Sequence, residues 1–364
     1  MNILLLVAEF PPTMLGGLAN YSYSIAKFLR RKNHVDVNMF PHGRSLTVYV
    51  ANLGFVINME RKLQEKGALK KVDVVYAITF QPHFSAIGFS AKLLGLPFVS
   101  HGVGLDIYTP RPWYVFARKT AYVISDRIIC GSGFQRRILV REGAPYEKVK
   151  VVLGGVDLDI FRPLKARDEF RKELGVEGKF VLLSLGRLEK RKGFDDAIKA
   201  LAYLKDIRDI VLLIVGKGSE KSHLEDLARD LSLENKVKFL GFVSSDDLPK
   251  IYNVADLFIA PFKSLGRDME GFPLVVQEAQ ACGVPVVSTI TTSLPELVEN
   301  NRSGFLVRQS SPQDIAEKIR ILYENDKLCK KMGENALRMA KDVLSLEVAA
   351  AKIENILRLA LVSR

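Results

Sequence analysis

The chain has 364 residues and a formal net charge of +12, from 53 Lys and Arg against 41 Asp and Glu. Hydrophobic residues make up 48% and charged residues 26%, which is typical of a globular protein and excludes a largely disordered chain. No apolar run reaches the ~18 residues that a membrane-spanning helix needs. The start of the chain does not resemble a secretory signal, and three widely spaced cysteines exclude a disulfide framework. We therefore expect a cytoplasmic protein of two domains.

The excess positive charge is confined to the first half of the chain. Residues 1–167 carry 23 Lys and Arg against 11 Asp and Glu, whereas residues 168–364 carry 30 of each. A basic half favours anionic partners, such as nucleic acid, an acidic membrane surface or phosphorylated substrates. The alternative is a lysine-rich surface with no partner.

Short apolar runs alternate with segments of helical spacing along the first half. The strands expected there are 2–8, 35–40, 72–77, 97–100 and 127–130. The helices expected between them are 17–32, 83–94 and 113–124.

The second half repeats this alternation. Its expected strands are 180–186, 210–216, 237–241, 256–261 and 284–288. Its expected helices are 193–203, 219–231, 245–253, 273–282 and 311–324, followed by an amphipathic helix at 345–360. Two such series predict an α/β protein with two doubly wound parallel sheets. We place the first domain at 1–165 together with 345–364, the second at 166–344, and the linker near 163–178.

Two glycines, Gly16 and Gly17, follow the first strand and precede a helix. Without a Cβ they let the backbone approach a ligand closely, and the amides at the start of a helix suit an anion. A tight strand–helix turn with no ligand is the alternative. The pair is not a G-x-G-x-x-G fingerprint, and no acidic residue closes the second strand, which argues against a nicotinamide enzyme.

His101 follows the strand at 97–100, at the carboxyl end where open α/β sheets place ligands. Gly102 and Gly104 have no side chains, so the backbone beside His101 leaves space for a ligand. The alternative is a hydrogen-bonded histidine with a structural role.

A basic loop, RLEKRKG, follows the strand at 180–186. Arg187 and Lys192 lie on either side of this loop, ahead of a helix, and two such cations can bind phosphate. Lys190 and Arg191 in the same loop are expected to be solvated.

The segment 266–288 combines two glutamates with the start of a helix. Glu270 and Glu278 are eight residues apart, and Pro273 between them suits a first helical turn. Glu278 can accept hydrogen bonds from paired hydroxyls such as those of a ribose. The backbone N–H groups that would face a diphosphate are those of Gly271, Phe272 and Leu274.

Five motifs resemble retaining glycosyltransferase family 4, and they occur in the order expected over nearly the whole chain. They are LGGLAN, HGVGLD, GVDLDIFRP, GRLEKRKG and EGFPLVVQE, the last followed by EAQACGVPVVS. The resemblance implies a GT-B fold, in which two Rossmann-like domains face each other across a cleft and the last helix crosses back to the N-terminal domain. It also implies a nucleotide-diphosphate sugar as co-substrate, bound by the C-terminal domain, and no metal or other cofactor.

The resemblance further implies roles for single residues. Arg187 and Lys192 would neutralise the donor diphosphate, Glu278 would bind the ribose, and Glu270 would contact hydroxyls of the donor sugar. His101 would touch the transferred sugar near the acceptor. Gly16 and Gly17 would lie against the phosphates or the acceptor. The base pocket would be lined by Gly216, Gly218, Gly241 and Phe242.

The predicted function is therefore retaining, metal-independent transfer of a hexose to a sugar, glycolipid or other hydroxyl acceptor. No D-x-D metal-ligand motif is seen near a predicted strand end. Met14 replaces the lysine that glucan synthases of the family have before the glycine pair, which disfavours a glucan synthase. A nucleotide-sugar epimerase of the same fold and a non-catalytic sugar-nucleotide-binding subunit remain alternatives. Nucleic-acid binding is not expected, because basic motifs interleaved with aromatic residues are lacking.

The segment 111–127 mixes basic and aromatic residues with helical spacing. Arg118 and Lys119 lie close to Trp113 and Phe116, a combination that suits a lipid headgroup interface. We therefore expect an anionic or lipid-linked acceptor and peripheral contact with the inner membrane face. The alternative is that these aromatic residues fill the core.

Overall fold

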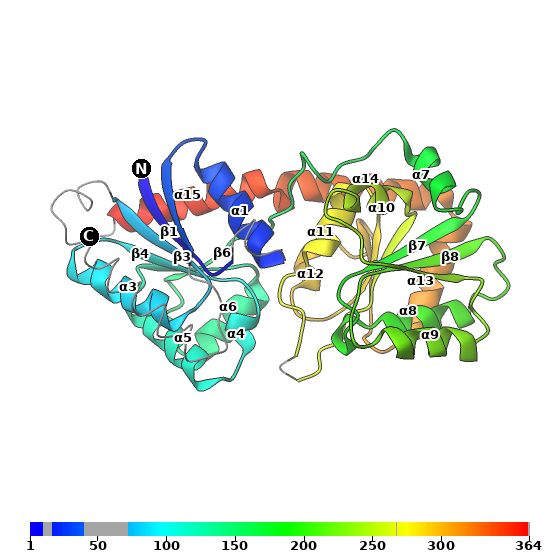
Figure 1. Ribbon diagram of the computed structural model, residues 1–364, viewed down its shortest axis with the longest axis horizontal. Coiled ribbons are helices and arrows are strands. Elements are labelled where there is room, and N and C mark those ends of the chain that lie inside the picture. The colour runs from blue at the N-terminus through cyan, green and yellow to red at the C-terminus, as the bar shows by residue number, and fades with distance from the viewer. Residues whose placement is uncertain (10–16, 40–71, 267, 363–364) are drawn as a thin grey trace. The chain divides into compact units, whose positions relative to one another are not determined.

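The computed structural model describes residues 1–9, 17–39, 72–266 and 268–362, which form two compact units. The first unit consists of Met1–Gly155 and Leu346–Arg364, and the second of Val156–Ser345. The first unit thus ends at Gly155, before the boundary at 165 expected from the sequence. Within the described residues, each unit contains one six-stranded sheet flanked by helices (Figure 1).

The sheet of the first unit is parallel, with strand order β2-β1-β3-β4-β5-β6. Five of its strands lie where they were predicted, whereas the short edge strand β6 was not among the predictions. The strands are β1 (Asn2–Val7), β2 (His34–Met39), β3 (Val74–Ile78), β4 (Phe98–Gly102), β5 (Arg127–Cys130) and β6 (Val149–Val151).

Helices cover both faces of this sheet, because alternate residues of a strand point to opposite faces. Ile3 and Leu5 of β1 pack in one core with residues of α1 and α15, and Leu4 and Leu6 pack in another with residues of α3. Figure 1 shows α1 and α15 on one side of the sheet and α3 and α5 on the other. The helices are α1 (Gly17–Leu29), α3 (Pro82–Leu93), α4 (Leu105–Tyr108), α5 (Pro112–Ile124), α6 (Gly133–Arg141) and α15 (Leu346–Val362).

The C-terminal helix α15 belongs to the first unit, as predicted. Its buried residues include Leu346, Ala349, Ile353 and Leu357, which are spaced three or four apart and so form one apolar stripe. They join the core that contains β1, β3 and α1.

The second unit has a parallel sheet with strand order β12-β11-β10-β7-β8-β9. The chain builds β7 to β9 toward one edge and then returns to add β10 on the other side of β7. All the predicted strands are present, and β12 is an additional edge strand. The bounds are β7 (Phe180–Leu185), β8 (Ile210–Val215), β9 (Val237–Gly241), β10 (Leu257–Ala260), β11 (Val286–Thr289) and β12 (Gly304–Val307).

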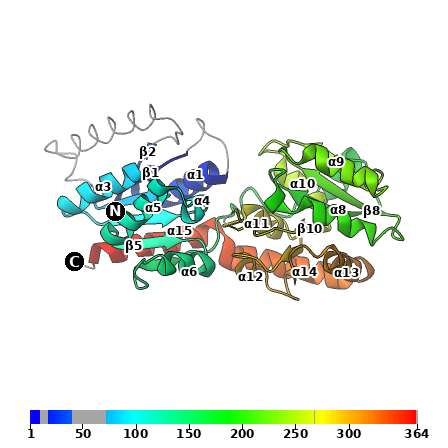
Figure 2. The same ribbon diagram turned by 90° about the horizontal axis from the view of Figure 1, so that it is seen from below.

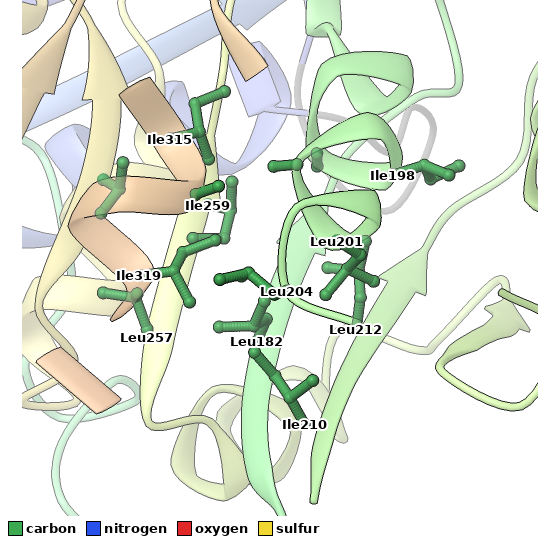
Figure 3. Packing of buried hydrophobic residues seen from close by; sticks show 14 of the residues in the cluster. Leu182, Ile198, Leu201, Leu204, Ile210, Leu212, Leu257, Ile259, Ile315 and Ile319 are labelled. Atoms are coloured by element: carbon green, nitrogen blue, oxygen red, sulfur yellow. The ribbon is translucent and has the colours of Figure 1, made fainter. Parts of the chain in front are cut away.

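Aliphatic side chains from the sheet and its helices fill the core of the second unit. In Figure 3, Leu182, Leu212 and Ile259 from the strands lie among Leu201 of α8 and Ile319 of α13. Figure 2 shows helices above and below this sheet. The helical segments are α7 (Arg167–Glu173), η2 (Lys190–Lys192), α8 (Phe194–Ala202), α9 (Lys221–Asp230), α10 (Leu248–Val254), α11 (Leu274–Ala281), α12 (Leu294–Leu297), α13 (Pro312–Glu324), α14 (Asp326–Met339) and η3 (Ala340–Leu344).

The order of the strands identifies where each unit can bind a ligand. In an open α/β sheet, ligands bind outside the carboxyl ends of the strands at the point where the strand order reverses. That point lies between β7 and β10 in the second unit and between β1 and β3 in the first. Across the described residues, no helix combines the length and the hydropathy needed to cross a bilayer.

Candidate active site

Two loops leave the sheet of the second unit at its reversal point, one after β7 and one after β10. They approach each other so closely that Gly193 has no room for a side chain. A Cβ on Gly193 would lie 1.9 Å from the carbonyl oxygen of Pro261, and the residue has a φ of +70°. The Lys263 amide also donates to the Arg191 carbonyl, with an N–O distance of 2.8 Å. The local sequence therefore holds the basic loop against the loop that carries Glu270.

Lys192 and Glu270 form the centre of this site. Lys192 Nζ lies 2.6 Å from Glu270 Oε2, and it also lies 4.9 Å from the centroid of the Phe262 ring. Burial raises the pKa of Glu270, but the adjacent Lys192 and Arg191 outweigh this effect and hold the pKa below its usual value. Glu270 is therefore an ionised carboxylate held by two cations.

Arg191 is buried, so the expectation that it is solvated is wrong. Its guanidinium lies 2.5 Å from Glu270, 2.6 Å from Glu189 and 3.1 Å from Asp268. The cause is the 3₁₀ turn at Lys190–Lys192, in which successive side chains point about 120° apart. Lys190 consequently faces solvent, whereas Arg191 and Lys192 face inward.

Arg187 lies at the exposed side of the same charged cluster. Its side chain is 68% exposed, and its Nη1 lies 3.1 Å from Glu189 Oε1. In this cluster the positive charges of Arg187, Arg191 and Lys192 are balanced by Glu189, Asp268 and Glu270. An anion that binds Lys192 must therefore compete with Glu270 for it.

Glu278 lies on α11 and is held by a tyrosine that the sequence analysis did not single out. The Tyr252 hydroxyl donates to Glu278 Oε2 over 2.6 Å, and the Tyr252 side chain is completely buried. Burial raises the pKa of Glu278 to about 7, although the Tyr252 hydrogen bond and Lys192 act in the opposite direction. Tyr252 therefore holds one of the two carboxylate oxygens of Glu278.

The start of α11 lies between the two glutamates. Leu274 is its first residue, so the Leu274 N–H is one of the four that lack a partner within the helix. Gly271 is buried, and its carbonyl accepts a hydrogen bond from Ser293 Oγ over 3.0 Å. Phe272 follows it and is partly exposed. The predicted amide-bearing segment therefore does precede a helix, with Pro273 at its cap.

The residues predicted to line a base pocket lie at the carboxyl ends of β8 and β9. Gly216 and Gly218 allow the loop after β8 to touch the loop after β7. A Cβ on Gly216 would lie 1.9 Å from the Gly186 carbonyl oxygen, and one on Gly218 would lie 2.3 Å from that of Leu188. Gly241 has a φ of +70°. Phe242 is exposed, with Lys217 Nζ 5.6 Å from its ring centroid.

His101 lies in the first unit, at the carboxyl end of β4. It is 1% exposed, its Nδ1 lies 2.7 Å from the Tyr76 hydroxyl, and the Tyr21 ring meets its ring edge-on. Burial lowers the pKa of His101 to about 3, so that the ring is neutral. Gly17 is the first residue of α1, whereas Gly16 and Met14 lie outside the described residues.

No three His, Cys, Asp or Glu residues within the described ranges are grouped so that they could hold a metal ion. Asp157 and Asp159 do have D-x-D spacing, in the loop that follows β6. There, the Asp159 N–H donates to Asp157 Oδ1 over 3.0 Å, as in a turn.

Helix α5 differs from the surface helix expected at 111–127. Arg118 is only 1% exposed, and its guanidinium donates to the Glu142 carboxylate and to the carbonyls of Asp106 and Thr109. Arg118 therefore cannot meet a membrane, and that part of the prediction is wrong. Trp113 and Phe116 on the same helix are exposed.

Comparison with known proteins identifies the family of this chain. The model for Glycosyl transferases group 1 matches residues 166–339, and the model for Glycosyltransferase Family 4 matches residues 15–160. The chain is a family 4-like glycosyltransferase. This result confirms the predicted family and agrees with the motifs on which it was based.

Three relatives illustrate how far the similarity extends. An uncharacterised glycosyltransferase of Methanocaldococcus jannaschii is 28% identical over 353 residues, which is 87% of each chain. The GDP-mannose-dependent alpha-(1-6)-phosphatidylinositol monomannoside mannosyltransferase of Mycobacterium tuberculosis is 31% identical over 239 residues, or 64% of this chain and 62% of the relative. The crystal structure of Anabaena HepE in complex with UDP superposes with a TM-score of 0.80, at 24% identity, over 98% of this chain and 100% of HepE. The family 4-like chain therefore has the predicted GT-B type of fold, with two Rossmann-like units.

Proposed function

We propose that this glycosyltransferase transfers a hexose from a nucleotide-diphosphate sugar to a hydroxyl acceptor, with retention of configuration and without a metal ion. The observation that carries the proposal is the cluster of Lys192, Glu270 and Glu278 around the start of α11, at the reversal point of the second sheet. Anabaena HepE has been crystallised with UDP and with UDP-glucose, and the mycobacterial relative is named as dependent on GDP-mannose. These relatives support a nucleotide-sugar donor and leave the nucleotide and the sugar open.

Each charged group has a separate task in this proposal. Arg187 and Lys192 bind the diphosphate, assisted by the first N–H groups of α11. Glu278 accepts hydrogen bonds from the ribose hydroxyls, and Glu270 accepts them from the sugar. His101 contributes a neutral hydrogen-bonding group to the transferred sugar.

The reaction breaks the bond between the sugar and the diphosphate. Its transition state resembles an oxocarbenium ion, and negative charge develops on the leaving phosphate oxygen. Lys192 and the α11 amides stabilise that charge. As the acceptor hydroxyl attacks the anomeric carbon from the face that the phosphate leaves, the departing phosphate takes up the hydroxyl proton. The products are a glycoside of retained configuration and a free nucleoside diphosphate.

A transfer assay tests this proposal. The protein is incubated with UDP-, GDP- and ADP-hexoses and a mixture of sugar and glycolipid acceptors, in excess EDTA, and products are followed by mass spectrometry. We expect a glycoside whose anomeric configuration, read by NMR, matches that of the donor. Loss of activity in EDTA that Mn²⁺ or Mg²⁺ restores would contradict the metal-independent mechanism. A changed sugar on an intact nucleotide would indicate an epimerase, and binding without turnover would indicate a non-catalytic subunit.

An apolar surface on the first unit supports a lipid-linked acceptor. Phe89 and Leu93 of α3 and Trp113, Phe116 and Val123 of α5 are all exposed, and the two helices are neighbours (Figure 1). We call these five residues the α3–α5 patch. Exposed aromatic and aliphatic side chains on adjacent helices are typical of contact with a membrane interface. We propose that this patch, rather than Arg118, makes the peripheral membrane contact.

We expect replacement of the patch to release the protein from vesicles. The variant F116S/V123S should lower the partition coefficient on mixed phosphatidylcholine and phosphatidylglycerol liposomes by on the order of tenfold or more. Burial of each apolar side chain in the membrane contributes ~1.5–3 kcal/mol to the binding free energy, and the variant loses this contribution. Co-sedimentation measures this. Tyr203→Ser is the control for loss of an exposed aromatic side chain, since Tyr203 is 51% exposed but lies in the other unit. Equal recovery of all three proteins with vesicles would contradict the assignment.

A further inference from the structure

The His101 ring has a single described hydrogen-bond partner, and that partner is a buried tyrosine. The Tyr76 hydroxyl lies 2.7 Å from His101 Nδ1, and the Tyr76 side chain is 0% exposed. The two rings are nearly parallel, with an interplanar angle of 21° and centroids 6.1 Å apart. Tyr76 therefore fixes both the position and the rotation of the imidazole.

Counting donors and acceptors gives the direction of this hydrogen bond. A neutral histidine has one N–H donor and one acceptor nitrogen, and a tyrosine hydroxyl has one proton to donate. If Nδ1 carried the proton and donated to Tyr76, both the tyrosine O–H and the lone pair of Nε2 would lack a partner among the described residues. If Tyr76 donates to Nδ1, only the Nε2–H remains. Because each buried polar group without a partner costs ~1–3 kcal/mol, the second arrangement is favoured.

The backbone around His101 is held as firmly as its ring. The Thr79 N–H donates to the His101 carbonyl over 2.7 Å, and Thr79 has a φ of +89°, which is unusual for a β-branched residue. At the next position, a Cβ on Gly102 would lie 2.5 Å from the Phe80 ring and 2.8 Å from the Ile107 side chain. Strained backbone of this kind persists where the surrounding structure fixes it, and such positions cluster at ligand sites.

We propose that Tyr76 is a positioning residue that holds His101 as the tautomer with its proton on Nε2, so that His101 donates a hydrogen bond to a hydroxyl oxygen of the sugar. The contact with the sugar rests on the proposed function, whereas the tautomer rests on the first unit alone. Since the buried ring is neutral, His101 acts as a fixed dipole and carries no charge to the substrate. Among the described residues, the titratable groups in contact with the ring are Tyr21 from α1 and Tyr76 from β3, and burial raises the pKa of both, so they are neutral.

NMR of the full-length protein labelled with ¹⁵N-histidine tests the tautomer directly. The His101 signals are identified as those absent from His101→Gln. We expect an unprotonated Nδ1 and a protonated Nε2 that do not change across neutral pH. Tyr76→Phe should shift the ring toward a mixture of tautomers. A protonated Nδ1 in the wild type, or a His101 that titrates near neutral pH, would overturn the proposal.

Enzymatic assays test what the tautomer does. The side-chain amide of glutamine can place an N–H near the position of Nε2, whereas that of asparagine lies near Nδ1. We expect His101→Gln to retain at least tenfold more turnover than His101→Asn, and Tyr76→Phe to lower kcat at an unchanged KM for the donor. Tyr122→Phe is the matched control, because it removes another buried tyrosine hydroxyl of the same unit, which bonds to Glu142. Its kcat should stay at the wild-type level.

The two experiments separate two kinds of failure. A wild-type protein without transfer activity would refute the proposed function, and the NMR measurement would still decide the tautomer. If the wild type is active and asparagine substitutes as well as glutamine, the Nε2–H donor is refuted even though transfer stands.

Discussion

Replacement of Lys192 by alanine should lower turnover by ~10²-fold or more, similar to the loss of one donor from an oxyanion hole. Lys192 is a buried cation 2.6 Å from Glu270, and in the proposed mechanism its interaction with the diphosphate strengthens as charge develops on the leaving oxygen. The affinity for the donor should fall as well, because the ground-state diphosphate is already charged. Steady-state kinetics with the donor identified in the transfer assay measure both effects.

Lys190→Ala is the matched control for this variant. Lys190 lies in the same 3₁₀ turn and has the same charge, but its side chain faces solvent. Its removal tests whether any positive charge near the site is enough to support turnover. We expect turnover to change by less than about twofold, since an exposed charge interacts only weakly with other charged groups. Equal losses for the two variants would assign Lys192 to a general electrostatic role. Unchanged turnover in Lys192→Ala would exclude it from the transition state.

Arg191 makes the Lys192→Ala experiment interpretable. In that variant Glu270 keeps its ion pair with Arg191, which in turn is held by Glu189 and Asp268. The Glu270 carboxylate therefore does not become an unpaired charge that collapses the site. By the same argument, Arg191 keeps Glu270 ionised when Lys192 binds a diphosphate and its ion pair with Glu270 is weakened.

The sheets could be predicted from sequence because their interior strands are buried on both faces. Runs such as 180–186 and 210–216 are almost wholly apolar, which distinguishes a central parallel strand from an amphipathic edge. The missed strands β6 and β12 are edge strands of three and four residues. β6 contains Lys150 and β12 begins with Gly304, so neither stands out as an uninterrupted run of apolar residues. Helix α14 was also not predicted, although its Cys329, Met332 and Ala336 form a buried stripe.

The candidate site was predicted in part, because sequence patterns report residue types near strand ends and not the direction of each side chain. Lys192, Glu270 and Glu278 do meet around the start of α11. Arg191 was expected to be solvated but is buried, because the 3₁₀ turn at Lys190–Lys192 points its side chain inward, whereas Arg187, which precedes that turn, is exposed. Arg118 was misplaced for a related reason, because its partner Glu142 lies outside its helix.

The supporting tyrosines could not have been found in this way. Tyr76 lies in an apolar strand and Tyr252 lies among the buried residues of α10, positions where a tyrosine resembles any other core residue. Only the three-dimensional contact shows that each hydroxyl meets a functional candidate. Their pairing with His101 and Glu278 links the packing of the core to the chemistry of the site.

Glu278 should make nucleotide binding depend on pH. In the proposed site, the ionised carboxylate accepts hydrogen bonds from the ribose hydroxyls better than the protonated acid would, and burial raises the pKa of Glu278 to about 7. Binding therefore favours loss of the proton, so donor affinity should rise from pH 6 to pH 8 and level off above it. Isothermal titration should use the intact nucleotide sugar, because its diphosphate does not change charge in this range, whereas the terminal phosphate of a free nucleoside diphosphate does.

Two variants test the origin of this pH dependence. Glu278→Gln should weaken binding at pH 8 by ~1.5–3 kcal/mol, the value of a charged hydrogen bond, and should abolish the dependence on pH. Tyr252→Phe removes a hydrogen bond that lowers the pKa of Glu278, so it should move the midpoint to higher pH. A wild-type profile that is flat between pH 6 and 8, or one that Glu278→Gln leaves unchanged, would show that Glu278 does not bind the ribose.

The same substitution should have the opposite effect on stability. The pKa of Glu278 is raised in the folded state above its ordinary value of 4.5, which applies to an unfolded chain, so the folded state holds its proton more tightly. The resulting stabilisation is fully present below pH 4.5 and is lost as the pH rises through about 7. Glu278→Gln removes the ionisation, so its melting temperature should exceed that of the wild type at pH 8 and approach it near pH 5, as measured by differential scanning calorimetry. A variant that melts higher at pH 8 yet binds donor more weakly would show that this buried carboxylate is retained for ligand binding at the expense of the fold.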